Sequence, residues 1–117
     1  MIRVKRVYEP ADEGDGFRVL VDRLWPRGLN KERAKLDFWA KEFAPTEGLR
    51  KWFGHDPQKW REFKRRYFEE LRQNKAWIQK FLQGVGRKTI TLVYAAKADK
   101  FNNAQALKEY IERESLK

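Results

Sequence analysis

The sequence predicts an α/β domain in which helices flank a small, mostly parallel sheet. Short apolar runs of strand length alternate with longer segments whose apolar residues recur at helical spacing. Strands separated by helices in this way favour a layered domain with parallel strands. The chain has 117 residues, of which 41% are hydrophobic, and this size and apolar content suit one domain, residues 1–117, with a single core.

Three segments have the pattern of strands. Residues 2–7 roughly alternate between apolar and basic side chains, whereas residues 17–24 and 89–96 contain continuous apolar runs. Continuous runs are typical of strands that are covered on both faces. Residues 36–43 fit both helical spacing and strand alternation, and we favour a strand. The acidic residues 9–16 are expected to form a loop.

Capping residues mark the central helices. Thr46 can cap a short helix that stops before Gly54, and Asp56 can cap the next helix, with Pro57 at its first position. The buried stripe of that second helix consists of Trp60, Phe63, Tyr67, Phe68 and Leu71.

Two further helices are expected towards the end of the chain. Residues 74–82 form the first, closed by Gly84 and Gly86. Asn102 is the expected N-cap of the last helix, whose inward stripe contains Leu107, Tyr110 and Ile111.

Composition limits the classes of function. Lys and Arg outnumber Asp and Glu by 27 to 17, and the resulting net charge of +10 favours phosphate-bearing or other acidic partners. The chain has no cysteine, which excludes disulfides, thiolate nucleophiles and cysteine-ligated metals. No signal peptide or membrane-spanning segment is recognisable, so we expect a cytoplasmic protein without a membrane partner.

The stretch DRLWPRG, residues 22–28, follows the second predicted strand and carries candidate site residues. In parallel α/β sheets ligands bind beyond the carboxyl ends of the strands. Arg23 and Arg27 would donate to a phosphate or carboxylate, with Trp25 as a stacking wall. Asp22 would orient an arginine or accept a proton. In the alternative interpretation, a buried Asp-Arg pair only rigidifies the turn and the tryptophan packs in the core.

The segment 52–56, which links two predicted helices, could close over the same edge. It contains Trp52, a further candidate ligand contact, and His55, the only histidine. His55 is a candidate general acid or base because its ordinary pKa lies near neutral pH. The alternative is that His55 only forms a hydrogen bond with a backbone carbonyl.

The exit of the last predicted strand carries Lys97, Asn102 and Asn103. Backbone amides at the start of the final helix could bind an anion, with the lysine adding charge. The alternative is an ordinary helix N-cap, with a lysine that extends to water.

Metal and cofactor sites are not expected. A single histidine and scattered carboxylates do not make a metal site. Residues 84–89 precede a strand, whereas a phosphate-binding glycine loop follows one. Asp12, Glu13 and Asp15 lack the ligand spacing of a calcium loop, and we interpret them as a solvated turn.

Three stretches, VLVDRLWPRGL, LRKWFGHDPQKW and YAAKADKFNNA, resemble the YeaO-like branch of the domain-of-unknown-function family 488. The resemblance covers nearly the whole chain in the same order. It implies a small bacterial or archaeal protein of Rossmann-like character without an established activity. Other branches of that family carry Cys-Ala-Glu and then Cys-His-Arg around the last strand and helix start. Here Tyr94–Ala96 and Asn102–Ala104 stand in those places, so thiol or metal chemistry does not transfer.

Two functional hypotheses remain. In the first, the chain binds a small anion at the carboxyl edge of the sheet, with His55 as proton carrier if it is an enzyme. In the second, it is a nucleic-acid-binding accessory protein, because of its charge and its five tryptophans. The cations of the helix expected from residue 57 to residue 73 alternate with glutamates, so a self-paired solvent face is the simpler interpretation of that helix. The sequence leaves the oligomeric state open.

Overall fold

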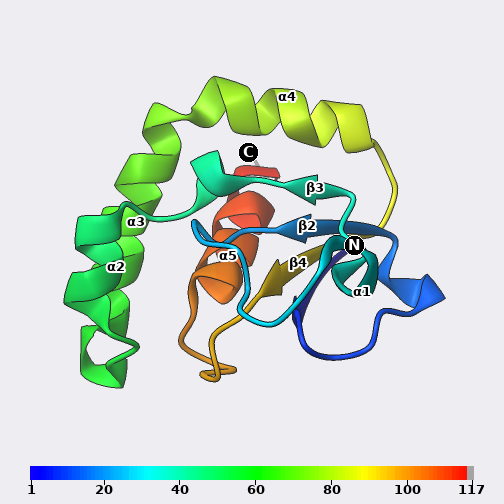
Figure 1. The fold of residues 1–117 in the computed structure, drawn as a ribbon. Helices are drawn as coiled ribbons and strands as arrows, with labels where there is room; N and C mark the ends of the chain where they lie inside the picture. Colours follow the sequence, from blue (N-terminus) through cyan, green and yellow to red (C-terminus); the bar gives the residue numbers. More distant parts are fainter. Residues whose placement is uncertain (116–117) are drawn as a thin grey trace.

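A parallel sheet forms the centre of the molecule (Figure 1). In the computed structural model, which describes residues 1–115, the sheet has four strands in the order β1-β4-β2-β3, and all neighbouring strands are parallel. The strands are β1 (Ile2–Arg6), β2 (Phe17–Leu20), β3 (Phe38–Trp39) and β4 (Ile90–Tyr94). The prediction of an α/β fold with a small parallel sheet and flanking helices is therefore confirmed.

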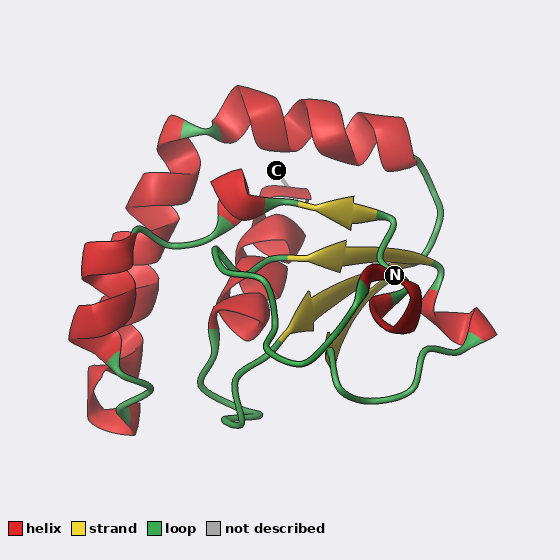
Figure 2. Ribbon diagram, in the orientation of Figure 1, coloured by secondary structure: helices red, strands yellow, loops and turns green. Residues whose placement is uncertain are grey.

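β4 occupies the middle of the sheet although it is the last strand in the sequence. Val4 of β1 and Val19 of β2 both stand in register with Leu92 of β4. Every residue of β4 is buried, which explains its uninterrupted apolar composition. Helices cover the sheet and close its carboxyl edge, where the strand arrows end in Figure 2.

The helices agree with most of the capping predictions. Thr46 accepts a hydrogen bond from the Leu49 amide (3.3 Å), and α2 ends at Gly54 as expected. Asn102 accepts one from the Gln105 amide (2.9 Å) and so caps the last helix. The structure has α1 (Lys31–Ala34), α2 (Glu47–Phe53), α3 (Trp60–Gln73), α4 (Lys75–Val85) and α5 (Asn103–Ser115), with 3₁₀ turns at Glu13–Asp15, Lys41–Phe43 and Pro57–Lys59.

Several predicted boundaries are wrong. The strand expected over residues 17–24 ends at Leu20. Beyond it, the Asn103 side chain donates to the Val21 carbonyl and the Trp39 indole donates to the Asp22 carbonyl, so these carbonyls do not continue the strand pairing. Pro57 begins a 3₁₀ turn, and α3 starts only at Trp60. α4 continues through Gly84 and ends before Gly86.

The region between β2 and α2 also differs from the prediction. Residues 36–43 form only the two-residue strand β3 and then a 3₁₀ turn. α1 was not among the expected helices. Its N-cap is Asn30, which accepts a hydrogen bond from the Arg33 amide (2.8 Å).

α5 packs on β1 and β4, whereas α2 and α3 stand beyond the carboxyl ends of the strands (Figure 1). α4 then returns the chain along the β3 side of the sheet. Its Phe81 ring packs on Phe38 at 5.5 Å and on Phe43 at 5.4 Å between ring centroids. Among residues 1–115, no helix has both the length and the apolar character needed to cross a bilayer.

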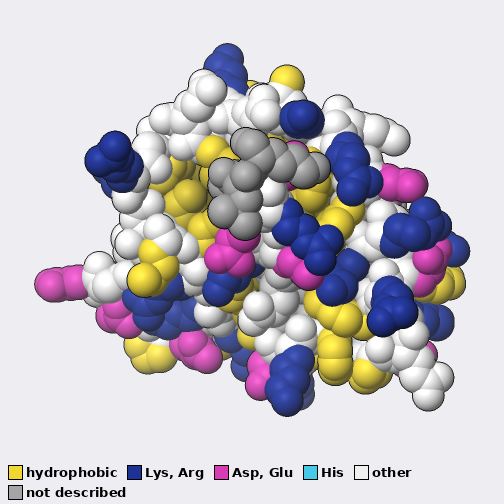
Figure 3. Space-filling model, turned by 180° about the vertical axis from the view of Figure 1, so that it is seen from behind, with side chains coloured by type: hydrophobic (Ala, Val, Ile, Leu, Met, Phe, Trp, Pro, Cys, Tyr) yellow, Lys and Arg dark blue, Asp and Glu magenta, His cyan; other side chains and the backbone are white. Residues whose placement is uncertain are grey.

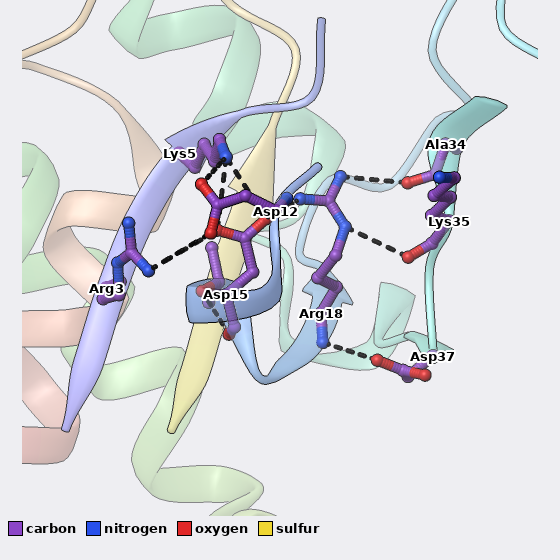
Figure 4. Close-up of polar contacts among 9 residues, drawn as sticks. Arg3, Lys5, Asp12, Asp15, Arg18, Ala34, Lys35 and Asp37 are labelled. Carbon is purple, nitrogen blue, oxygen red and sulfur yellow. Dashed lines mark hydrogen bonds and ion pairs between the residues drawn. The ribbon is translucent and has the colours of Figure 1, made fainter. Parts of the chain in front are cut away.

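A buried ion cluster joins the first two strands near α1 (Figure 4). The Asp15 carboxylate is fully buried and contacts Arg18 Nη1 at 2.6 Å and Lys5 Nζ at 3.2 Å. Arg18 also donates to the carbonyls of Ala34 (2.9 Å) and Lys35 (3.0 Å). The prediction of a solvated turn is therefore wrong for Asp15, because two basic side chains from the strands replace its water.

Candidate functional site

A cavity of about 380 Å³ lies at the carboxyl edge of the sheet. Its wall comes from the loops after β1 and β2, from α2 with the segments before and after it, from α3, and from the segment between the end of β4 and the start of α5. The structure brings six of the nine candidate site residues into this wall: Asp22, Arg23, Trp25, Arg27, His55 and Asn103.

Asp22 lies on the sheet side of the cavity. Its Oδ2 accepts a hydrogen bond from the Ala95 amide (2.9 Å), just after β4, and its Oδ1 accepts one from Asn103 Nδ2 (3.2 Å) at the start of α5. Burial raises the pKa of the Asp22 carboxyl above its ordinary value, and these two hydrogen bonds oppose the shift only in part. Asp22 therefore connects β2, β4 and α5 directly at the cavity.

Arg23 does not pair with Asp22. Its guanidinium donates to the backbone carbonyls of Pro45 (3.3 Å) and Ala44 (3.5 Å). No Asp-Arg ion pair forms at this turn within the described part of the chain, so the rigidifying pair considered above is not what holds it. The Trp25 indole donates to the Leu29 carbonyl (2.7 Å), which fixes the ring beside the cavity.

Arg27 and Arg50 supply accessible positive charge. Both side chains belong to exposed residues that line the cavity. Within residues 1–115, the Arg27 guanidinium forms no hydrogen bond or ion pair. Arg50 has a long contact of 3.9 Å with Glu47, and its charge also acts on the Asp22 carboxyl. An arginine without a partner retains all its planar N–H donors for an anion.

Sequence reasoning missed Arg50 and Tyr8. Tyr8 follows β1 and lines the cavity, and its hydroxyl donates to the Arg27 carbonyl (2.8 Å). Both residues had a usable signal. Tyr8 stands at the exit of a predicted strand, and Arg50 lies on a predicted helix just before the segment 52–56.

His55 has a left-handed backbone (φ 57°) that turns the chain between α2 and α3. Its Nδ1 lies 3.0 Å from the Phe101 carbonyl, and this nitrogen must be the donor because a carbonyl oxygen can only accept. The contact is the backbone hydrogen bond of the alternative interpretation. It holds His55 in the cavity wall, next to the loop that leads into α5.

Three candidate residues lie outside the cavity wall. Trp52 is half-buried, with Arg66 at 4.4 Å and Lys59 at 5.1 Å from its ring. Asn102 is fully buried and caps α5, donating to the Ala98 carbonyl (2.8 Å). Lys97 is exposed, as in the solvent-facing alternative. None of the three adds a group to the cavity.

Three basic side chains of α3, those of Lys64, Arg65 and Arg66, pair with acids. Glu62 accepts hydrogen bonds from Arg65 and Arg66 (both 2.8 Å), and these hydrogen bonds lower its pKa to about 2. Lys64 contacts Glu109 of α5 at 3.0 Å. Basic and acidic side chains are also interspersed on the face shown in Figure 3. The self-paired interpretation therefore holds for Arg65 and Arg66, whereas Lys64 pairs with another helix, and Arg61 and Arg72 are exposed.

No group of three or more histidine or acidic residues within residues 1–115 is placed to hold a metal ion.

The fold and the cavity define a small parallel α/β protein with a cationic hollow at the carboxyl edge of its sheet. The chain belongs to the DUF488 family, since the model described as "Inactive DUF488-N3 subclade" matches residues 1–117. This membership confirms the resemblance seen in the sequence.

Curated relatives match most of the chain. It is 39% identical to "Uncharacterized protein YeaO" of Escherichia coli K12 over 110 residues, which cover 94% of this chain and 96% of that protein. It is 43% identical to "Uncharacterized protein Rv3073c" of Mycobacterium tuberculosis over 96 residues, 82% of this chain and 80% of that protein. No solved structure matches the chain significantly.

The raised pKa of Asp22 predicts how stability depends on pH. Between the unfolded and the folded pKa, only the folded state retains the proton, so the free energy of unfolding falls as pH rises through this window. Urea unfolding at pH 3 to 7 should show wild type losing stability relative to Asp22→Asn as pH rises. Asp15→Asn is the matched contrast: relative to this variant, wild type should gain stability as pH rises. The reason is that burial, which would raise the pKa of Asp15, is outweighed by its hydrogen bonds and by the Lys5 charge, which lower it. Equal slopes for the two variants would contradict the assignment.

Proposed function

We propose that this protein binds a small molecule bearing a phosphate or carboxylate in the cavity at the carboxyl edge of its sheet. The observation that carries the proposal is the convergence of Arg27, Arg50 and His55 on one hollow of about 380 Å³. This volume falls within the range of small-molecule sites. The description of the subclade as inactive supports a binding domain over an enzyme.

The charge balance of the cavity favours an anion. Among the described residues, three arginines and one carboxylate line the wall: Arg23, Arg27, Arg50 and Asp22. Arg23 is held by backbone carbonyls and contributes fixed charge. Arg27 is free to donate two parallel hydrogen bonds to a phosphate or carboxylate.

The rest of the wall favours an organic anion over an inorganic one. Apolar surface comes from Trp25, Phe53 and Phe63, together with Leu24 and Pro26. Ligand sites typically combine such a mostly apolar lining with a few placed polar groups. We therefore infer that the ligand has an apolar or aromatic body as well as its charge.

The second candidate is nucleic-acid binding, for which the net charge of +10 is the supporting observation. The pairing of Arg65, Arg66 and Lys64 with glutamates leaves fewer cations of α3 for phosphate contacts. The small-molecule proposal is preferred for this reason.

Calorimetric titration with phenyl phosphate tests the proposed site. Wild type should bind it, and Arg27→Ala should weaken binding by about 10- to 150-fold, the loss expected for charge-assisted hydrogen bonds of about 1.5–3 kcal/mol. Lys97→Ala is the matched control, because it removes the same charge from an exposed position outside the cavity. Undetectable binding by wild type, or equal weakening in both variants, would defeat the proposed site.

A further inference from the structure

Asp22 is an acid within a cationic cavity, and the proposed anion does not explain it. Each of its oxygens accepts one hydrogen bond, from Ala95 and from Asn103, whereas a carboxylate offers about four acceptor positions. None of the described residues forms an ion pair with it. The carboxylate lines the cavity, so it can accept a further hydrogen bond from a ligand.

Asp22 and the two arginines differ in exposure, although the charge of Arg50 still acts on the Asp22 carboxyl. Asp22 is tied to the ends of β2 and β4 and is only partly exposed, so it lies on the sheet side. Arg27 and Arg50 are exposed and lie at the solvent side. Aromatic and apolar side chains, including Phe53 and Phe63, complete the wall.

This arrangement restricts the ligand. A second anion placed beside Asp22 would be repelled, so the anionic group belongs with the arginines. A hydrogen-bond donor placed beside Asp22 would give a partner to a desolvated carboxylate. A site built around such an acceptor discriminates strongly against an analogue that lacks the donor.

We propose that the ligand is bipolar, with an anionic group for Arg27 and Arg50 and, across an aromatic or apolar body, an N–H donor for Asp22. This inference rests on the proposed function and narrows its ligand class. It disfavours inorganic phosphate and compounds that are anionic at both ends.

Two isosteric probes test the inference: 4-aminophenyl phosphate and 4-methylphenyl phosphate. They share the phosphate and the ring, and they differ only in an amine or a methyl group. Wild type should bind the amine at least about tenfold more tightly, since one hydrogen bond to a charged group is at stake. In Asp22→Asn the preference should fall below about threefold, while the methyl probe should bind as well as before or better. Repeating the comparison with 4-aminobenzoate and 4-methylbenzoate distinguishes a phosphate ligand from a carboxylate ligand.

The outcomes separate this inference from the proposed function. If both probes bind wild type equally and Arg27→Ala weakens both, the anion site stands and the bipolar ligand is overturned. If neither probe binds, the proposed function fails and the inference fails with it. The wild-type comparison needs no variant to fold, and Lys97→Ala, which changes an exposed residue outside the cavity wall, should retain the preference for the amine.

Discussion

Replacing Asp15 with alanine is expected to lower the free energy of unfolding by about 3–5 kcal/mol, the usual cost of removing one partner of a buried ion pair. Asp15 is fully buried and lies 2.6 Å from Arg18, whose exposed fraction is 4%. Without the carboxylate, the Arg18 charge remains buried and Lys5 loses the same partner. The cluster joins β1 and β2, which flank β4 on opposite sides (Figure 4).

Asp12→Ala is the control for this prediction. Asp12 also contacts Lys5 (3.1 Å), but 56% of its side chain is exposed, so its loss should cost no more than about 1 kcal/mol. Urea unfolding followed by circular dichroism gives both values. A cost for Asp15→Ala as small as that for Asp12→Ala would mean that water already screens the buried pair.

The elements that sequence alone predicts are those determined by local chemistry. The strand Ile90–Tyr94 is apolar at nearly every position, and few other structures suit such a run at the centre of a domain. Thr46, Gly54 and Asn102 act on amides and carbonyls within a few residues of themselves. These signals do not depend on distant parts of the chain.

The elements that sequence analysis missed depend on distant partners. β2 stops at Leu20 because Asn103, far away in the sequence, donates to the Val21 carbonyl (2.8 Å). Asp15 looks like a loop acid until Lys5 and Arg18 are brought beside it. No periodicity in residues 9–16 reports those neighbours.

The residues of the candidate site also divide into those that a sequence rule predicts and those that it misses. The rule that ligands bind beyond the carboxyl ends of parallel strands selects Asp22, Arg27 and Asn103, which line one cavity. The rule does not give side-chain direction, so it also selected Lys97, which lies outside that wall. Arg50 enters from a helix, where the rule does not apply.

Gly16→Ala is expected to destabilise the fold by roughly 2–6 kcal/mol, the combined range for a strained backbone and overpacking. Gly16 has φ 62° and ψ −131°, a region that is essentially restricted to glycine. A Cβ there would lie 2.3 Å from the Thr89 carbonyl oxygen, which accepts the hydrogen bond of the Phe17 amide (2.8 Å). The chain would have to shift where β2 joins β4, which are paired through Phe17 and Ile90.

Gly28→Ala separates the clash from the backbone strain in this prediction. Gly28 also has a positive φ, 77°, but a Cβ at that position would meet nothing within 4 Å. Its substitution should therefore cost only the left-handed backbone strain, about 1–2 kcal/mol. Thermal unfolding of the two variants should show the larger loss for Gly16→Ala. Equal losses would indicate that the chain relaxes at Thr89 without disturbing the pairing of β2 with β4.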